Sequence, residues 1–193
     1  MRTVAVAERM TAEQYLALGE PLEGRTRTQL IGGEVVVNEP KPLHGFVQRD
    51  LLAALIAWTR AAAGRGAVML PLDVVLDEHN VYAPDVLWYA EGRAPDRHAE
   101  PPSPMPDLAI EVRSPSTWRF NVGAKKTAYD RCGLRELWLV DTAAEAVLVF
   151  RRSGRDAPTF DVALEVARDE SLASPLLPGF ALALVELFPR RLR

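Results

Sequence analysis

Cysteine and histidine are scarce in this sequence, and their scarcity excludes several kinds of site. Cys132 is the only cysteine among 193 residues, so no intrachain disulfide can form and a cytoplasmic location is expected. The histidines are His44, His79 and His98, and they form no cluster with cysteine of the zinc-binding kind. A G-x-S-x-G motif and a glycine-rich phosphate loop are also absent. Zinc, serine-hydrolase and P-loop chemistry are therefore not expected.

Long apolar runs and an excess of positive charge are missing too. The N-terminus lacks the apolar segment of a secretory signal, and the longest apolar helical run, at 51–58, is too short to span a bilayer. We therefore expect an unexported protein of one domain, residues 1–193, whose 48% hydrophobic residues can build a substantial core. The net charge of −3 is not typical of a strong non-specific DNA-binding protein.

Two carboxylates lie at the ends of predicted strands. Asp85 follows Pro84 and opens the run 85–89, whose β-branched and aromatic residues are typical of a strand. Glu111 lies near the end of a second apolar strand, 108–112. Burying an ionised glutamate there is costly unless it is paired or bound to a metal. The alternative is a strand-end glutamate that faces solvent or an arginine.

A lysine accompanies the two carboxylates on the next predicted element. Residues 116–132 are expected to form a helix, with Ser116 or Thr117 as its N-cap. One stripe of this helix contains Trp118, Val122, Lys125, Tyr129 and Cys132. Lys125 is the only charge on the stripe, so we expect it to face the sheet that carries both carboxylates. The alternative is a buried stem with its ammonium group in water.

Periodicity and turn residues predict the other elements. Two helices are expected, over 11–18 with Thr11 and Gln14 at capping-box spacing, and over 46–63 with Val47, Leu51, Leu55, Trp58 and Ala62 facing inward. The expected strands are a hairpin over 28–39, a strand over 68–76 that turns at 77–80, and a buried strand over 137–140. A second hairpin is expected from 146–151 with 160–166. The proline-rich stretch 91–106 is expected to be a long loop. These elements indicate an α/β fold with a mixed sheet.

The sequence resembles the Uma family of restriction-endonuclease-like proteins, which belongs to the PD-(D/E)XK nuclease superfamily. The residues that carry the resemblance are Tyr82-Ala83-Pro84-Asp85-Val86, the run from Pro106 to Thr117, Lys125 with Tyr129, and the run from Gly133 to Asp141. It extends over residues 10–179 and implies a core of helix, three strands, helix and strand. An N-terminal helix and hairpin and a C-terminal hairpin would flank this core.

The resemblance also implies a catalytic site. Asp85, Glu111 and the carbonyl of Val112 would hold Mg²⁺ or Mn²⁺, with Lys125 as the catalytic lysine. Glu34 matches a further acidic position of the family, although it could equally be a strand residue that faces solvent. His44 matches a histidine of the family and could lie near the site or act only as a surface or capping residue.

Basic side chains that could contact phosphates, or could simply be solvated, are Arg113, Arg119, Lys125, Lys126, Arg131, Arg190, Arg191 and Arg193. Two positions depart from the pattern of this family and superfamily. Arg113 lies where the superfamily usually has its lysine, and arginine stays protonated and cannot act as a base. Asn121 lies where the family commonly has an aspartate, four residues before Lys125.

We therefore expect a metal-dependent endonuclease that acts on nucleic acid, with DNA as the expected substrate and a homodimer as a common assembly of the superfamily. Lys125 would orient or deprotonate the attacking water, or stabilise charge in the transition state. The alternative is a catalytically weak or inactive nucleic-acid-binding or protein-interaction module that keeps the fold. Asn121, Arg113 and the acidic net charge favour that alternative.

Overall fold

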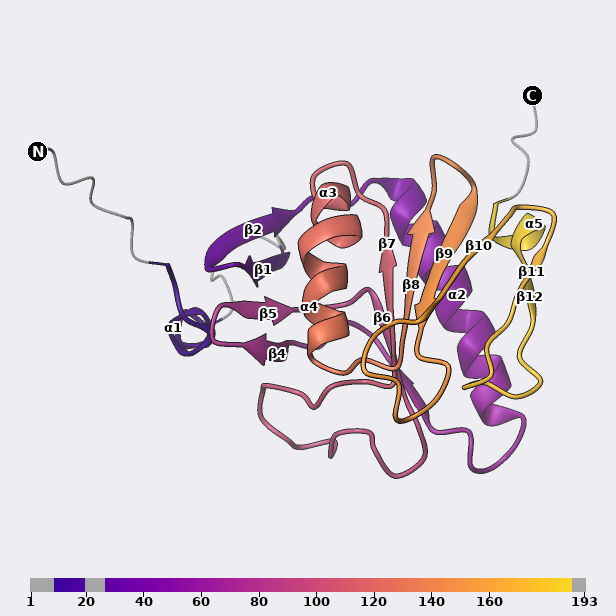
Figure 1. Ribbon diagram of the computed structural model, residues 1–193, viewed down its shortest axis with the longest axis horizontal. Helices are drawn as coiled ribbons and strands as arrows, with labels where there is room; N and C mark the ends of the chain where they lie inside the picture. The colour runs from indigo at the N-terminus through magenta and orange to yellow at the C-terminus, as the bar shows by residue number, and fades with distance from the viewer. Residues whose placement is uncertain (1–8, 20–26, 189–193) are drawn as a thin grey trace, which may run out of the picture.

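In the computed structural model, residues 9–19 and 27–188 are described, and they form two larger sheets and a two-stranded one, with helices packed against them (Figure 1). The helices are α1 (Ala12–Ala17), α2 (Pro42–Arg60), α3 (Trp118–Phe120), the π-helical turn η1 (Asn121–Lys125), α4 (Lys126–Arg131) and α5 (Leu184–Leu187). The strands are β1 (Arg27–Ile31), β2 (Glu34–Asn38), β3 (Ala67–Met69), β4 (Val74–Asp77), β5 (Asn80–Tyr82), β6 (Val86–Tyr89), β7 (Leu108–Val112), β8 (Glu136–Asp141), β9 (Ala146–Arg151), β10 (Val162–Val166), β11 (Ser171–Leu172) and β12 (Leu182–Ala183).

The larger sheet has the strand order β10-β9-β8-β7-β6-β3, and β7 with β8 is its one parallel pair. A parallel pair needs a crossover connection, and the helical segment 118–131 supplies it. The predicted core of helix, three strands, helix and strand is confirmed as α2, β3, β6, β7, the 118–131 segment and β8. The predicted C-terminal hairpin is also confirmed, because β9 and β10 extend this sheet.

The smaller sheet has the order β2-β1-β5-β4 and is antiparallel throughout. Its β1–β2 hairpin and the preceding helix α1 confirm the N-terminal predictions. The capping box of α1 is formed. The backbone N–H of Thr11 donates to the Gln14 side chain at 2.7 Å, and the backbone N–H of Gln14 donates to the Thr11 hydroxyl at 3.2 Å. This sheet lies on the same side of the core as α4 (Figure 1).

Alternation along β7 separates two buried layers. Leu108, Ile110 and Val112 pack with α2 and the C-terminal segment, whereas Ala109 packs with α4 and the smaller sheet. Successive side chains of a strand point to opposite faces, so Glu111 shares the face of Ala109. Its carboxylate therefore points toward the helical segment 118–131.

Helix α2 begins earlier than predicted. It starts at Pro42, which occupies the first helical turn, where its missing N–H is not needed. This boundary places His44 inside the helix instead of before it. The helix ends at Arg60, so the predicted inward position of Ala62 is wrong and this residue is exposed.

The predicted strand over 68–76 is wrong as a single element. Its residues divide between β3 in the larger sheet and β4 in the smaller one. Pro71 lies in the break, where proline cannot donate a ladder hydrogen bond, and Leu70 is 55% exposed. The apolar alternation in this stretch therefore serves two different sheets.

The predicted helix over 116–132 contains an unexpected π-helical turn. In η1 the backbone is wider than in an α-helix, so a stripe calculated from a regular α-helix no longer follows one face. Val122, predicted to face inward, is 43% exposed, whereas Asn121 is 1% exposed. Lys125 and Tyr129 are buried as predicted, and the N-cap residue Thr117 makes no side-chain capping bond.

Other expectations concern the surface and the termini. Across residues 9–19 and 27–188, no helix combines the length and apolarity needed to cross a membrane. Cys132 is half-buried, and its thiol donates to the carbonyl of Leu76 at 3.2 Å, which agrees with a structural role. The basic residues Arg190, Arg191 and Arg193 lie outside the described residues.

Two glycines after α2 offer a matched test of how closely the segment after α2 approaches the end of β6. Gly64 and Gly66 both have positive φ, at +77° and +70°. A Cβ at Gly64 would meet open space, whereas one at Gly66 would overlap the carbonyl oxygen of Tyr89. We expect Gly64→Ala to cost about 1 kcal/mol of unfolding free energy and Gly66→Ala about 3 kcal/mol or more. Urea unfolding measures both, and equal losses would contradict the close approach.

Candidate functional site

Asp85 and Glu111 come from neighbouring antiparallel strands. Asp85 immediately precedes β6, in which Val86 pairs with Ile110 of β7. The two carboxylates therefore lie at the same end of the strand pair. The connection is direct, because the backbone N–H of Val112 donates to Asp85 Oδ2 at 2.7 Å. Both carboxylates are buried.

Helix α2 contributes two side chains to the surroundings of Asp85. His44 Nε2 lies 3.1 Å from Asp85 Oδ2, an ion-pair distance without hydrogen-bond geometry. One helical turn later, the amide of Gln48 donates to the backbone carbonyl of Asp85 at 2.7 Å. Residues four apart share a helix face, so the first turns of α2 fix the beginning of β6.

Glu111 has two partners from the opposite helical segment. Its Oε1 atom forms an ion pair with the Lys125 ammonium and accepts a hydrogen bond from the Tyr129 hydroxyl at 2.9 Å. Lys125 is 1% exposed, and its ammonium also lies over the Tyr82 ring at 5.2 Å. The predicted inward position of Lys125 is confirmed, and the alternative of an ammonium in water is wrong.

Burial dominates the electrostatics of this cluster. It raises the pKa of the Glu111 carboxyl above its ordinary value; nearby Asp85 adds to the shift and the Lys125 ammonium opposes it. Burial, and next the neighbouring Glu111, also raise the pKa of the Tyr129 hydroxyl. Tyr129 therefore stays a protonated donor to Glu111.

Three buried side chains, from α2 and from the helical segment 118–131, carry polar atoms without a hydrogen-bond partner among the described residues. They are His44 Nε2, Lys125 Nζ and both amide atoms of Asn121. Lys125 and Asn121 lie on the inward face of the same helical segment, one π-helical turn apart. His44 and Lys125 have carboxylate ion-pair partners, so the Asn121 amide is the one of the three with no partner among the described residues. A buried amide without a partner is costly, so it marks a place where a ligand or substrate group can be received.

The other side chains proposed from the sequence have different surroundings and partners. Glu34 is exposed at the beginning of β2 and, within the described part of the chain, has no contact with Asp85 or Glu111. Arg113 is bound to both carboxylate oxygens of Asp141, at 2.8 and 2.9 Å. Arg119 is exposed and lies over the Phe120 ring at 4.6 Å.

Sequence reasoning missed two contributors. Gln48 lies inside the predicted helix 46–63, but a start at residue 46 leaves His44 outside that helix. The earlier start, which Pro42 signals, places His44 and Gln48 on one face. Asn38 ends β2 and accepts a hydrogen bond from the Ser114 hydroxyl at 3.1 Å. Nothing local in the sequence indicates this second contact, because it joins the end of β2 to the turn after β7, two segments far apart in the sequence.

The oxygen donors available to a cation are few. The described residues contain no group of three or more His, Cys, Asp or Glu side chains arranged to hold a metal ion. Two carboxylates are present, together with the backbone of Val112, whose N–H points toward Asp85. In a strand, the C=O of a residue points to the same side as its N–H, so the Val112 carbonyl faces this edge too.

The ion pair of Glu111 and Lys125 can be tested through stability. We expect Lys125→Met to lower the unfolding free energy by about 3–5 kcal/mol at pH 7, because the buried Glu111 carboxylate loses its partner. The loss should shrink toward pH 5, since the raised pKa of Glu111 allows its protonation. The double variant E111Q/K125M should recover most of the loss in urea unfolding. A double variant as unstable as K125M would contradict this pairing.

Comparisons with known proteins identify the family and support the fold. The sequence model of the Uma2 family, described as "Putative restriction endonuclease", matches residues 12–185. A crystal structure of a putative nuclease of the DUF820 family from Anabaena variabilis is similar in fold, with a TM-score of 0.74 and 18% sequence identity over 93% of this chain and 97% of that one. No curated protein matches the chain. The match over residues 12–185 establishes that the chain belongs to the Uma2 family.

Proposed function

We propose that this protein is a divalent-metal-dependent endonuclease that hydrolyses phosphodiester bonds of DNA at the site formed by Asp85, Glu111 and Lys125. The observation that carries the proposal is the burial of two carboxylates from adjacent strands next to a buried lysine. Membership of a family described as restriction endonucleases supports the same reaction class. Perturbed, partly unsatisfied groups of this kind are concentrated at functional sites.

The donor set fits a hard cation. Mg²⁺ is held by one or two carboxylates and keeps several waters, so Asp85, Glu111 and the Val112 carbonyl would suffice. Among the described contacts, both partners of Glu111 bind Oε1, which leaves Oε2 for a cation. When bound, the cation would polarise the scissile phosphate and make a bound water more acidic.

The protein side chains have separable tasks in this scheme. The attacking water must lose a proton, and the leaving oxygen must gain one. Lys125, already paired with Glu111, is best suited to stabilise the negative charge that develops on the phosphate. Tyr129 fixes the orientation of Glu111, and Gln48 fixes the backbone of Asp85. His44 Nε2 is available to exchange a proton or contact a phosphate oxygen.

Nearby cations could position the DNA backbone. Arg119 is exposed on the helical segment that carries Lys125 and has no ion pair among the described residues. Lys41 is exposed immediately before α2, the helix that carries His44. Arg113 is less suitable, because its guanidinium is already bound to Asp141. Such contacts position a nucleic acid without reading its sequence.

A catalytically inactive nucleic-acid-binding module is the second candidate. Two observations favour it: the unpartnered amide of Asn121 lies where the family commonly has an acid, and the net charge is −3. Such a module would bind DNA in a salt-dependent way without cleaving it and without binding a cation.

Cleavage of DNA separates the two candidates. We expect plasmid and linear DNA to be cleaved with Mg²⁺ or Mn²⁺. Asp85→Asn should reduce the rate at least about 100-fold, because the cation that activates the attacking water loses a charged ligand. The matched control is Asp96→Asn, in the exposed loop, which should keep the wild-type rate. Initial rates from gel densitometry measure both.

The outcomes of this experiment are distinct. Cleavage that survives unchanged in Asp85→Asn would contradict the site. Absence of metal-dependent cleavage by the wild-type protein, together with salt-dependent DNA binding, would support the binding module instead. Unfolding curves for each variant exclude loss of the fold as the cause.

Asn121 gives an independent test of cation binding. We expect Asn121→Asp to tighten Mn²⁺ binding by about tenfold, because it adds a buried carboxylate four residues before Lys125, the partner of Glu111. Asn121→Leu is the apolar control and should not tighten it. Isothermal titration calorimetry with MnCl₂ measures the dissociation constants. Unchanged affinity in Asn121→Asp would show that this position does not face the cation.

A further inference from the structure

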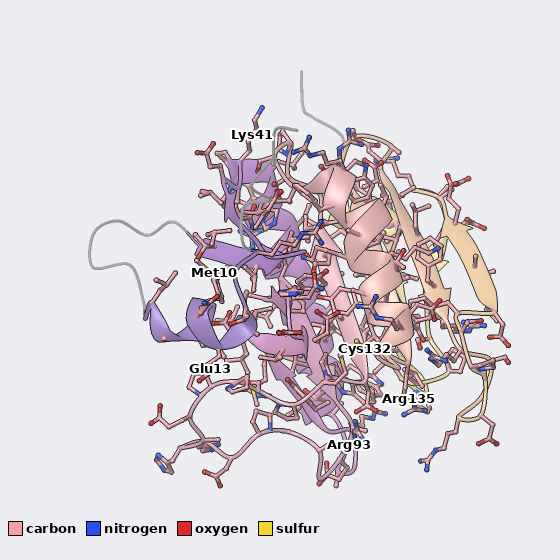
Figure 2. The ribbon with its side chains drawn as sticks, turned by 60° about the vertical axis from the view of Figure 1, so that its left-hand side comes forward. Met10, Glu13, Lys41, Arg93, Cys132 and Arg135 are labelled. Carbon is pink, nitrogen blue, oxygen red and sulfur yellow. The ribbon has the colours of Figure 1, made fainter. Side chains whose placement is uncertain are left out.

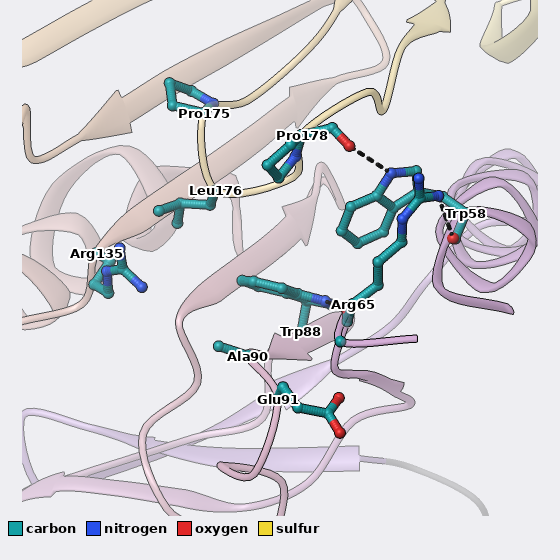
Figure 3. Close-up of a pocket in the computed structure, with 10 residues that line it drawn as sticks. Trp58, Arg65, Trp88, Ala90, Glu91, Arg135, Pro175, Leu176 and Pro178 are labelled. Atoms are coloured by element: carbon teal, nitrogen blue, oxygen red, sulfur yellow. Dashed lines mark hydrogen bonds between the residues drawn. The ribbon is translucent and has the colours of Figure 1, made fainter. Parts of the chain in front are cut away.

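Two adjoining cavities lie at the opposite end of the larger sheet from the proposed catalytic site. The first, the tryptophan cavity, has a volume of about 440 Å³ and lies between the end of α2, the end of β6 and the segment 175–178 (Figure 3). The second, the arginine cavity, has a volume of about 370 Å³. Ala90, Glu91 and Arg135 line both, so the two cavities are neighbours.

The tryptophan cavity has an apolar part, formed by its tryptophans, prolines, Leu176 and Ala90, and a charged part formed by Arg65, Glu91 and Arg135. Trp58 and Trp88 meet edge to face, with ring centroids 6.2 Å apart, and Leu176 and Pro178 face them across the cavity (Figure 3). Both indole N–H groups are already used, because Trp58 donates to the Pro178 carbonyl at 3.1 Å and Trp88 to the Arg65 carbonyl at 2.8 Å. The cavity thus offers contact area for a flat ring but no indole donor to distinguish one ring from another.

The arginine cavity contains more positive charge than its acids neutralise. Asp107, which is 1% exposed, holds Arg93 at 2.9 Å and Arg135 at 3.3 Å. The contact to Arg135 uses only Nη1, so most of its N–H donors remain free for a ligand. Arg155 is exposed and has no ion pair among the described residues.

The combined lining therefore suits an anion. It includes five arginines and two acids, Glu91 and Asp107. Arg152 already binds Asp130 at 3.3 Å and Arg65 the Trp58 carbonyl at 2.8 Å, so Arg135 and Arg155 are the two left for a ligand. Glu91 is partly satisfied by the backbone N–H of Gly66 at 3.1 Å. Arginine guanidinium groups match phosphate oxygens in geometry as well as charge.

These cavities are separate from the catalytic site. Lys41, immediately before the first turn of α2, and the pair Arg93 and Arg135 lie at opposite ends of the molecule (Figure 2). His44 and Trp58 are fourteen residues apart on α2, or about 21 Å at 1.5 Å per residue. At about 3.4 Å per nucleotide along one strand, this distance corresponds to about six nucleotides.

We propose that the two cavities form a nucleotide-binding site, in which a base occupies the tryptophan cavity and its phosphate binds Arg135 and Arg155. The base is held by apolar contact without readout of its edges, so binding shows little base preference. The ligand is either a free nucleotide or a flanking nucleotide of the strand being cleaved; the latter case rests on the proposed nuclease function. An acidic peptide would satisfy the arginines but lacks a flat base for the apolar cavity.

Binding of a labelled oligonucleotide tests this site without any cleavage. The probe is a fluorescein-labelled dT₁₂ in EDTA, followed by fluorescence anisotropy, with the wild-type protein and Arg155→Glu, Arg135→Gln and Leu176→Ala. We expect the affinity for the oligonucleotide to fall about tenfold in Arg155→Glu and severalfold in the other two variants. In Arg155→Glu, the slope of log affinity against log salt concentration should also decrease by about one, because about one fewer counterion is released on binding. Arg97→Glu, a charge reversal in the exposed loop outside both cavities, is the matched control and should bind more tightly than Arg155→Glu.

Competition identifies the source of the nucleotide. Displacement of the probe by dTMP or dAMP with similar affinities supports a free-nucleotide site. Displacement only by oligonucleotides of about eight residues or more supports a flanking nucleotide of the substrate. Equal affinity in wild type, Arg155→Glu and Leu176→Ala would overturn the proposal, as would displacement by an oligoglutamate peptide but by no nucleotide. Because EDTA removes metal-dependent cleavage, failure of the nuclease proposal and failure of this one remain distinguishable.

Discussion

The buried ion pair between Glu111 and Lys125 is the constraint on which the rest of this structure depends. An ionised glutamate on an apolar strand and a lysine that is 1% exposed would each be expensive alone. Their contact allows both to stay inside, with Tyr129 as an additional donor. The helical segment 118–131 must therefore pack with one face against β7, and the parallel β7–β8 crossover gives it that position.

The same end of β7 also fixes Asp85. The N–H of Val112 binds the Asp85 carboxylate, and α2 holds the residue from the other layer through His44 and Gln48. Three layers of the protein thus meet at two carboxylates. Such a site is positioned by strands and helices, which hold catalytic geometry more precisely than loops do.

Much of the fold could be predicted from the sequence, because its signals are local. The strand 108–112, the hairpin around Gly32 and the capping box of Thr11 all follow from periodicity and turn chemistry and are confirmed. The site could be predicted only as a set of residues, since Asp85, Glu111 and Lys125 are far apart along the chain. Their catalytic roles, the metal, the substrate and the homodimer stay predictions.

The errors also have physical causes. Pro71 divides an alternating run between two sheets, and periodicity cannot reveal which sheet each half joins. Val122 lies at the margin of the face that carries Lys125 and is exposed, whereas Asn121, four residues before Lys125, shares that face and is buried; the apolar character of Val122 led to the wrong choice between them. The contact of Asn38 with Ser114 depends on how the two sheets pack, which is information that no short segment contains.

The central claim is that Asp85 and Glu111 share one cation next to Lys125. The most direct measurement is the anomalous difference density of Mn²⁺ in crystals of the protein. The account predicts a peak within about 2.0–2.3 Å of an oxygen of both carboxylates. A peak bound elsewhere, or none at this position at millimolar Mn²⁺, would contradict it.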